Sequence, residues 1–379
     1  MIENKKIKVL YISNQGGGAP RSLLNMIKAL KNYVDPIVLF ENNWYDYKMF
    51  VNNGIKCIIV PYRLNLVLNE PGYKTVKWKI HRFLDELLKN RLVAYKVKKI
   101  LGKETIDIVH TNTGAITIGI SIAKMLKAKH VWHLREFQDK DFNGFPYNGW
   151  KNFYKLINKS DAVIAISKAV YRHFNLSIHK NSHIIWDGVR SKSSCIFNRE
   201  KKDFILYCSS TIYYNKGLHD LLEAYANSEL PKMQICLYVL GSMDEEYNQV
   251  IQKIINKYEI CKYVVFKGQC NNVDKYMSEA KFFVLPSLNE GLGRVVIEAM
   301  FNGCPVIVRN TGGPTEYIKD KINGFIFNTT SELTGLLNYV IKNNTESISL
   351  TAQKFVMENF SEEVYGKKVL NIYKELINA

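Results

Sequence analysis

Two glutamates, Glu290 and Glu298, stand eight positions apart around a glycine-flanked turn, Glu-Gly-Leu-Gly-Arg, that leads into an apolar segment. At about 100° per helical residue, eight steps leave two side chains roughly 80° apart, so one helix does not direct both at one ligand. If the helix begins near Gly293, Glu290 precedes it and both carboxylates can face the same ligand. Free N–H groups at a helix start bind anionic oxygens, and carboxylates accept hydrogen bonds from hydroxyls. The pattern therefore indicates a phosphate-bearing, polyhydroxylated ligand such as a nucleotide sugar, although an ordinary helix with a solvated Glu298 fits it equally well.

The length and composition of the chain limit which folds can position these residues. A length of 379 residues predicts two domains, and 47% apolar against 23% charged residues allows well-formed cores. The seven cysteines are scattered without a CxxC pair or a Cys/His cluster, so we expect neither a disulfide framework nor a zinc site. The first residues lack the apolar core of a signal peptide, and no apolar run reaches the ~20 residues of a membrane span. We expect a cytoplasmic protein.

The positive charge is confined to the first half of the chain. The formal net charge is +17, but residues 1–195 hold 32 Lys+Arg against 14 Asp+Glu, giving +18, and residues 196–379 hold 20 against 21, giving −1. Such asymmetry predicts that one domain meets an anionic surface or ligand, with nucleic acid and anionic lipid as the candidates.

Short apolar runs alternate with helical patterns twice along the chain, which predicts an α/β protein built from two doubly wound parallel sheets. The first set of expected strands covers residues 8–14, 37–40, 56–61, 107–112, 130–134 and 162–167, with helices such as 21–30 and 116–126. A polar linker is expected at 191–203. The second set covers strands 204–210, 234–241, 263–268, 282–287 and 305–309, with helices at 216–226, 245–257, 273–280 and 295–302. One more amphipathic helix is expected at 361–378.

Three further segments are candidates for a site, each with a plain structural alternative. Gly16, Gly17 and Gly18 follow the first strand, where glycines let the backbone approach a ligand; the alternative is a tight turn. This segment is not a GxGxxG fingerprint, so a dinucleotide site is weakly supported. Lys216 precedes Gly217 at the start of a helix and can reach a diphosphate, or it is simply solvated. His133 ends an apolar strand, where open α/β sheets border their ligands, although a lone histidine is more often structural.

Residues 73–103 carry ten lysines and arginines against Asp85 and Glu86, with aromatic and leucine side chains interleaved. A basic amphipathic helix of this kind is typical of membrane-surface association. The alternative is a core-packed helix with a solvated lysine face.

These motifs, in this order and over nearly the whole chain, resemble glycosyltransferase family 4, whose members are retaining enzymes of the GT-B fold. Glu290 to Glu298 resembles the family's E-x7-E element, and the Gly16 to Gly18 segment resembles its N-terminal glycine loop. His133 stands where the family has its cleft histidine, and Lys216 where it has its donor-phosphate lysine. Gly312-Gly313 with Glu316, and Asn323-Gly324-Phe325, resemble its closing elements. Family members commonly carry Gly-Arg five to six residues before the lysine, whereas this chain has Ser210 and Thr211 there.

The resemblance implies two Rossmann-like domains facing a central cleft. An acceptor-binding domain is expected over residues 1–195, joined by the C-terminal helix 361–379, and a donor-binding domain over 196–360. It implies a hexosyltransferase with His133, Glu290 and Lys216 in catalysis. The implied donor-binding set is Gly17, Gly18, Lys216, Gly268, Glu290, Gly291, Leu292, Gly293, Arg294 and Glu298. The resemblance implies a mechanism without metal, in which Lys216 and helix N-termini hold the departing diphosphate; the Asp-x-Asp triplet of this chain, Asp139-Lys140-Asp141, lies in the first half and outside this set.

The expected partners are a UDP- or GDP-linked sugar as donor substrate, with no further cofactor, and a lipid-linked or oligosaccharide acceptor. The basic half predicts an anionic membrane surface rather than nucleic acid as its partner, which places the protein on the inner face of the plasma membrane. Cell-surface polysaccharide or glycolipid synthesis is the expected role. A nucleotide-sugar epimerase of the same fold is one alternative, and a non-enzymatic protein that binds an anionic polymer is another, from a different class.

Overall fold

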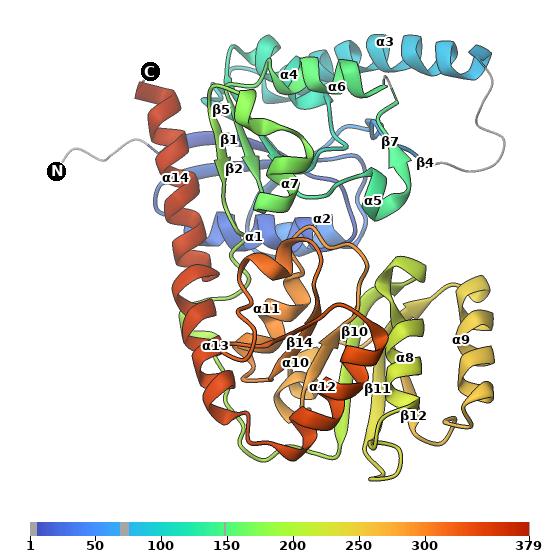
Figure 1. Ribbon diagram of the computed structural model, residues 1–379. Helices are drawn as coiled ribbons and strands as arrows, with labels where there is room; N and C mark the ends of the chain where they lie inside the picture. The colour runs from blue at the N-terminus through green and yellow to red at the C-terminus, as the bar shows by residue number, and fades with distance from the viewer. Residues whose placement is uncertain (1–5, 69–75, 148, 379) are drawn as a thin grey trace. The chain divides into compact units, whose positions relative to one another are not determined.

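The computed structural model describes residues 6–68, 76–147 and 149–378, which form two compact units (Figure 1). Unit 1 comprises the chain up to Gly188 together with the C-terminal segment from Glu362, and unit 2 comprises Val189–Ser361. The division falls at Gly188 rather than at residue 195, because the first residues of the expected linker already belong to unit 2. The return of the C-terminal helix to the N-terminal unit is as the sequence predicts.

Unit 1 is built on a parallel sheet of seven strands in the order β3-β2-β1-β5-β6-β8-β9. Its strands are β1 (Ile7–Ile12), β2 (Val34–Phe40), β3 (Lys56–Ile59), β5 (Ile108–Thr111), β6 (Lys129–Leu134), β8 (Ala162–Ala165) and β9 (Ser182–Ile184). The short strands β4 (Val67–Leu68) and β7 (Gly144–Phe145) pair antiparallel in a separate ribbon. Strand β9 was not expected, because its three residues, Ser-His-Ile, carry too little apolar pattern to indicate a strand.

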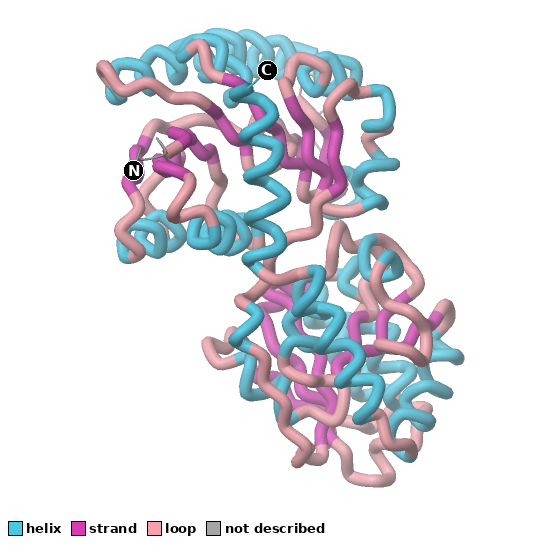
Figure 2. The backbone as a smooth tube through the Cα atoms, turned by 90° about the vertical axis from the view of Figure 1, so that its left-hand side faces the viewer, coloured by secondary structure: helices cyan, strands magenta, loops and turns pink. Residues whose placement is uncertain are grey.

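Helices cover both faces of this sheet, so its central strands are buried and apolar (Figure 2). The helices of unit 1 are α1 (Ala19–Ala29), α2 (Tyr45–Asn52), α3 (Val76–Leu101), α4 (Ile118–Leu126), α5 (Asp139–Phe142), α6 (Gly149–Ile157), α7 (Lys168–His173) and α14 (Glu362–Asn378). One core joins α1, α2 and α14 to one face of the sheet, and a second core joins α3 and α4 to the other. Unit 1 is therefore a three-layer sandwich of the expected Rossmann-like kind.

Unit 2 repeats the plan with a parallel sheet of six strands in the order β12-β11-β10-β13-β14-β15. The strands are β10 (Phe204–Ile212), β11 (Cys236–Met243), β12 (Val264–Gly268), β13 (Phe283–Leu285), β14 (Val306–Arg309) and β15 (Phe325–Phe327). Its helices are α8 (Leu218–Ala226), α9 (Glu245–Lys257), α10 (Val273–Glu279), α11 (Arg294–Phe301), α12 (Thr330–Lys342) and α13 (Glu346–Asn359). One core of this unit packs α8, α9 and α12 against a face of the sheet, while α11 contacts β13 and β14.

The carboxyl ends of parallel strands meet at one edge of a sheet, and the loops that follow them carry the ligands in this fold class. In unit 2 those loops are the ones after β10, β13 and β14, which contain Lys216, Glu290 and Gly312. The expected second-half strands are all present. Strand β15 and helices α12 and α13 lie in a part of the sequence for which no element was predicted.

Helices α1 and α14 approach each other closely at Gly366. A methyl group at this glycine would lie 2.7 Å from the Cβ of Ala29, inside van der Waals contact. Gly335 in α12 offers a matched comparison, because nothing lies within 4 Å of its added Cβ.

We predict that Gly366→Ala and Gly335→Ala change stability in opposite directions. Replacing a mid-helix glycine by alanine favours the helix by about 1 kcal/mol, and Gly335→Ala should gain up to that amount. In Gly366→Ala the overpacked helix contact should cost about 1–3 kcal/mol and outweigh the gain. Calorimetric unfolding of the two variants beside the parent chain measures both signs; a stabilised Gly366→Ala protein would contradict the close contact of α1 and α14.

Candidate active site

The turn between Glu290 and Arg294 connects β13 to α11 in unit 2. Gly293 precedes the helix with φ = 75°, a left-handed conformation that glycine adopts without strain, and α11 begins at Arg294. Glu290 therefore lies in the loop and Glu298 on the second turn of the helix, as the sequence predicts. Among the residues that the structure describes, the N–H groups of Gly291, Leu292 and Gly293 donate no hydrogen bond.

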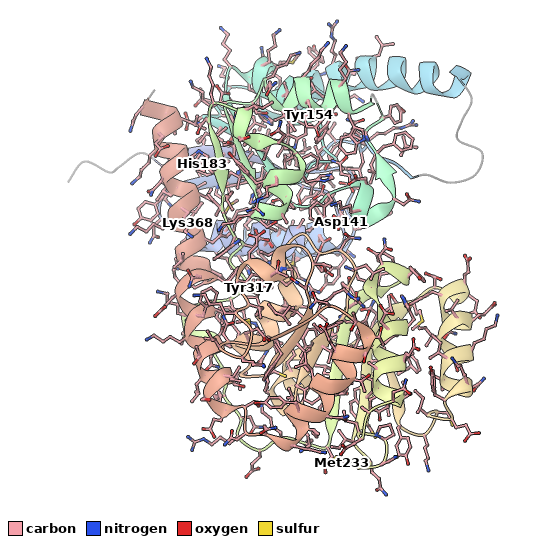
Figure 3. All side chains as sticks on the ribbon, viewed as in Figure 1. Asp141, Tyr154, His183, Met233, Tyr317 and Lys368 are labelled. Carbon is pink, nitrogen blue, oxygen red and sulfur yellow. The ribbon has the colours of Figure 1, made fainter. Side chains whose placement is uncertain are left out.

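A second glycine loop holds this turn in place. The Gly313 N–H donates to the Glu290 carbonyl at 2.9 Å. A Cβ atom at Gly312 would lie 2.2 Å from the Glu290 carbonyl oxygen, and one at Gly313 would lie 2.3 Å from that of Gly291, so both positions require glycine. The same region is closed by Tyr317, whose hydroxyl donates to the Leu292 carbonyl at 3.0 Å (Figure 3).

Lys216 reaches the turn from the loop after β10. Its ammonium donates to the Glu290 carboxylate at 2.7 Å, and the two side chains keep only 20% and 16% of their surface exposed. Gly217 has φ = 69°, and an added Cβ would lie 2.2 Å from the Pro286 carbonyl oxygen, so this loop presses against the end of β13. The Lys216–Glu290 pair is thus fixed by backbone contacts on both sides.

Arg294 and Glu298 form a second ion pair, 3.5 Å apart, on the first turns of α11. Burial, and next the charge of Glu298, raise the pKa of the Cys208 thiol, in the middle of β10, to about 12. The sequence motif therefore brings four charged side chains, Lys216, Glu290, Arg294 and Glu298, to the same end of unit 2.

Gly268 ends β12 with φ = 64° and is open on its outer side, since nothing lies within 4 Å of an added Cβ. The next residue, Gln269, donates from its amide to the Ser210 carbonyl at 2.6 Å and to the Ser242 hydroxyl at 3.0 Å. The structure thus places Ser210, in the segment where relatives commonly have Gly-Arg, in contact with the loop after β12. Thr211 lies beside it in β10 and is exposed.

The glycine loop of unit 1 lies between β1 and α1 and is exposed. Gly16 and Gly17 have φ of 88° and 75°, with open space around each added Cβ, and the Gly16 N–H donates to the Asp46 carboxylate at 2.6 Å. Gly17 and Gly18 belong to unit 1, whereas the rest of the expected donor-binding set belongs to unit 2.

His133 lies at the end of β6 and is fully buried in a polar network. Its Nδ1 is 3.3 Å from the guanidinium of Arg135, which also donates to the Asp187 carboxylate at 2.6 Å and to the Tyr365 hydroxyl at 2.9 Å. Tyr365 comes from α14, so the C-terminal helix supplies part of the surroundings of His133. His133 Nε2 has no hydrogen-bond partner within the described ranges.

Two more buried histidines flank this network. His110 bonds through Nδ1 to the Tyr373 hydroxyl at 2.7 Å, and His130 bonds to the hydroxyls of Thr111 and Ser160 at 2.9 and 3.0 Å. Burial, and next the charge of Arg135, lower the pKa of His133 and His110 well below the usual range, and burial lowers the pKa of His130 to about 3. All three imidazoles are therefore neutral at physiological pH.

Glu136 follows Arg135 and is half-buried. Its carboxylate accepts from the Gly114 and Ala115 N–H groups at 2.9 and 3.3 Å. Burial, and next the charge of Asp141, raise its pKa to about 7. Sequence reasoning missed Arg135, Glu136 and Tyr317. Charged residues directly after a buried strand were a usable signal for the first two, whereas nothing local marks Tyr317.

Comparisons with known families match both units. The family described as glycosyl transferases group 1 matches residues 190–355, and Glycosyltransferase Family 4 matches residues 16–192. The two matches together cover the glycine loops, Lys216 and both glutamates. The chain belongs to the GT-B glycosyltransferases.

Curated relatives and solved structures agree with this placement. An uncharacterized glycosyltransferase of Methanocaldococcus jannaschii is 24% identical over 95% of both chains. A sucrose synthase of Melioribacter roseus is 28% identical over 42% of this chain, but the match spans only 23% of its length. An alpha-monoglucosyldiacylglycerol synthase of Acholeplasma laidlawii is 26% identical over 46% of this chain and 44% of its own length. 

The structure of Anabaena HepE in complex with UDP superposes on this chain with a TM-score of 0.80, at 19% sequence identity over 98% of this chain and 100% of that one.

We predict that the stability of unit 1 falls as the pH drops below about 6.5. The folded state keeps His110, His130 and His133 neutral, whereas the unfolded chain binds their protons, so the free energy of unfolding rises with pH between about 3 and 6.5. Each such histidine contributes about 1.4 kcal/mol per pH unit well below 6.5. Glu136 opposes one of them, because its raised pKa makes the folded state bind the extra proton between about 4.5 and 7.

Urea unfolding as a function of pH measures this slope, and His130→Gln should reduce it. A parent chain whose stability is flat from about pH 7 to pH 5 would show that these histidines are not held neutral.

Proposed function

We propose that this transferase moves a sugar, with retention of configuration and without a metal ion, from a nucleotide sugar to a lipid-linked saccharide. The observation that carries the proposal is the Lys216–Glu290 pair, 2.7 Å long, beside the N–H groups that open α11. A cation, a carboxylate and unengaged N–H groups at one place match the diphosphate and hydroxyls of a sugar nucleotide.

In this proposal each part of the unit 2 turn has one task. The Lys216 ammonium, which donates to the Glu290 carboxylate at 2.7 Å, would also contact the diphosphate. Glu290 and the N–H groups of Gly291 to Gly293 hold the sugar, and Glu298 accepts hydrogen bonds from the ribose hydroxyls. Arg294, next to Glu298, supplies the second cation where relatives commonly have an arginine before the lysine.

The nucleotide is proposed to be UDP or GDP, and the solved structures favour UDP. Anabaena HepE, whose fold this chain shares, is described in complexes with UDP and with UDP-glucose. Gly268 fits a position beside the nucleotide, because its φ of 64° and open outer face let a flat ligand approach the backbone.

The bond changes follow from the proposed placement. The bond between the anomeric carbon and the diphosphate oxygen breaks, the acceptor oxygen bonds to that carbon on the same face, and the acceptor proton passes to the departing phosphate oxygen. Lys216 and the start of α11 stabilise the charge that develops on the diphosphate. Glu290 is committed to Lys216 and to sugar hydroxyls, which favours front-face attack over a covalent intermediate.

His133 is proposed to orient the sugar. A neutral imidazole can donate or accept a hydrogen bond, and the Nε2 atom of His133 has no partner in the part of the chain that is described. Arg135 fixes the ring through Nδ1, so the free atom is held in one direction. His133 is fully buried at the end of β6. A sugar would therefore have to lie against the end of this strand to contact it.

Helix α3 of unit 1 is the proposed membrane-docking element. Its inner side, Val93, Ala94 and Val97, is buried, whereas three apolar side chains on its outer side are 58–60% exposed: Leu88, Leu92 and Tyr95. Exposed cations flank them, namely Arg91, Lys96, Lys98 and Lys99. An apolar stripe flanked by cations suits the headgroup region of an anionic bilayer. Tyr73 and Lys74 lie outside the described residues.

A lipid-linked acceptor is supported by this surface and by the similarity to an alpha-monoglucosyldiacylglycerol synthase. No described helix is long and apolar enough to cross a membrane. The proposal places the transferase at the cytoplasmic face of the plasma membrane, in polysaccharide or glycolipid synthesis. Of the alternatives, a purely binding protein is excluded because the chain is a glycosyltransferase, and an epimerase is distinguished by products that contain no new glycosidic bond.

We predict that Glu298→Ala weakens UDP binding by about 1.5–3 kcal/mol, the value of a hydrogen bond to a charged acceptor. Titration calorimetry of the folded variant with UDP and with GDP measures the loss. Glu246→Ala, at an exposed first-turn glutamate of α9, is the matched control and should bind as the parent chain does. Parent-like affinity of Glu298→Ala would overturn the ribose assignment.

Transfer should persist in excess EDTA, because Lys216 and the N–H groups at the start of α11 take the place of a metal ion. No group of three His, Cys, Asp or Glu side chains within the described ranges is arranged to hold one. The measurement is sugar transfer from UDP-glucose in EDTA, with and without added Mg²⁺ or Mn²⁺. Complete loss that either ion restores would show that the charge on the diphosphate is neutralised by metal.

Unit 1 should dock reversibly on anionic vesicles. Each Lys or Arg near such a surface contributes about 1 kcal/mol, screened over roughly 8–10 Å, so binding should fall steeply with salt. The triple variant Lys96→Glu, Lys98→Glu, Lys99→Glu should lose most of it. Leu92→Ser should remove a smaller part that salt does not affect.

Vesicle co-sedimentation with and without anionic lipid is the measurement. The triple variant Lys232→Glu, Lys253→Glu, Lys354→Glu carries the same change in net charge on exposed lysines of unit 2 and should bind as the parent chain does. Equal binding to neutral vesicles, or none to anionic vesicles at low salt, would mean that the basic face serves another ligand, with nucleic acid to be tested next.

A further inference from the structure

A groove of about 530 Å³ lies on unit 2, where the edge strand β12, its neighbour β11 and the start of β10 meet α10. The lining of this groove includes neither Lys216 nor Glu290. Three aromatic residues, Phe204, Tyr238 and Tyr276, and three lysines, Lys202, Lys267 and Lys275, account for most of its lining. Its volume lies within the roughly 300–1,000 Å³ of small-molecule sites. None of these residues has a task in the proposed transfer reaction.

The aromatic rings form one connected layer. Phe204 and Tyr238 stack at 4.4 Å with their planes 13° apart, and Tyr276 meets them edge-on at 6.4 and 6.2 Å. Phe204 is buried, whereas both tyrosines are half-buried. The hydroxyls of Tyr238 and Tyr276 form no hydrogen bond with any residue that the structure describes, so they are available to a ligand.

The charges of the groove are unequally paired. Lys202 pairs with Glu279 at 2.9 Å, and Asp203 pairs with Lys281 at 3.1 Å, which engages both carboxylates of the lining. Lys267 and Lys275 have no carboxylate partner in the described ranges, and the Lys267 ammonium lies 4.7 Å from the centre of the Tyr238 ring. The groove therefore offers two cations that no protein carboxylate neutralises.

Lysines on an edge strand also have a purely structural use, because they prevent edge-to-edge pairing of sheets. That use explains Lys267 on β12, but it requires neither a connected aromatic layer nor two tyrosine hydroxyls without partners. It also leaves Lys275 unexplained, since this residue belongs to α10 rather than to the edge strand.

We propose that this groove is a second saccharide-binding site, which holds sugar units with acidic groups in the glycan that the transferase extends. Tyrosine offers an apolar ring to the C–H face of a sugar and a hydroxyl to its polar edge. Lys267 and Lys275 would form charge-assisted hydrogen bonds with carboxylate or phosphate substituents. The identity of the glycan rests on the proposed function, whereas the site itself does not. It would keep a growing chain on the enzyme between transfers, away from the donor.

The test is titration calorimetry on the full chain, with UDP in excess so that the donor site is occupied. The probes are hyaluronan oligosaccharides as an acidic glycan, dextran oligosaccharides as a neutral glycan, and polyphosphate as an anion without sugar rings. We expect hyaluronan to bind. Lys267→Glu with Lys275→Glu should weaken it at least tenfold, the effect of losing charge-assisted bonds. Tyr238→Phe with Tyr276→Phe keeps both rings and should weaken hyaluronan about three- to tenfold without affecting polyphosphate.

Lys262→Glu is the matched control, because its ammonium lies 4.9 Å from the centre of the Tyr263 ring but outside the groove. It should bind hyaluronan as the parent chain does. Absence of hyaluronan binding, or binding that the lysine variant retains, would overturn the proposal. Equal binding of dextran would refute the acidic specificity, and polyphosphate binding with no effect of the tyrosine variant would show an anion site only. UDP affinity in Glu298→Ala is a separate measurement, so failure of this site and failure of the donor assignment are distinguishable.

Discussion

The hydrogen bond from the Gly313 N–H to the Glu290 carbonyl is the contact on which the turn from Glu290 to Arg294 depends. Two backbone segments from different loops touch there without side chains between them. A side chain at either Gly312 or Gly313 would displace the turn by more than an ångström, because the space for a Cβ is already filled by carbonyl oxygens. Displacement of the turn would move Glu290 from Lys216 and shift the start of α11 at the same time. The glycines therefore act through geometry, and the charged residues act only once that geometry is set.

Unit 1 depends on a different constraint, the burial of a charged pair. Arg135 and Asp187 are 7% and 0% exposed, and a buried ion pair is stable only when its remaining donors and acceptors are satisfied. Asn112, Tyr365 and the ring of His133 meet the guanidinium, and Ser22 meets the carboxylate. These partners come from segments far apart in the sequence, including α14, which supplies Tyr365. The C-terminal helix α14 is thus held to the rest of unit 1 by the hydrogen bond of Tyr365 to Arg135, beside His133, as well as by the apolar core that it shares with α1.

Much of the fold follows from local pattern, and the exceptions have physical causes. Buried parallel strands are continuous apolar runs, so β1, β6 and β10 are evident from sequence, whereas β9 and β15 have only three residues each. In the same way, Glu290 and Glu298 are recognisable because glycines mark the turn between them. The partnership of Lys216 with Glu290 joins residues 74 positions apart and could be expected only from the family resemblance. The burial of His133 could not be predicted, because it depends on tyrosines from a helix more than 200 residues later.

The Lys216–Glu290 pair shows how two charges are held beside the start of α11. Each group is about four-fifths buried, and an isolated charge at such a depth is costly because it has lost most of its water. Mutual pairing at 2.7 Å offsets that cost and fixes both side chains in direction. In the proposed function the pair would persist when the donor binds, with the carboxylate accepting from sugar hydroxyls through its further lone pairs. The resting ion pair would then be a preorganised form of the proposed bound state, and electrostatic stabilisation of the leaving group would require little rearrangement.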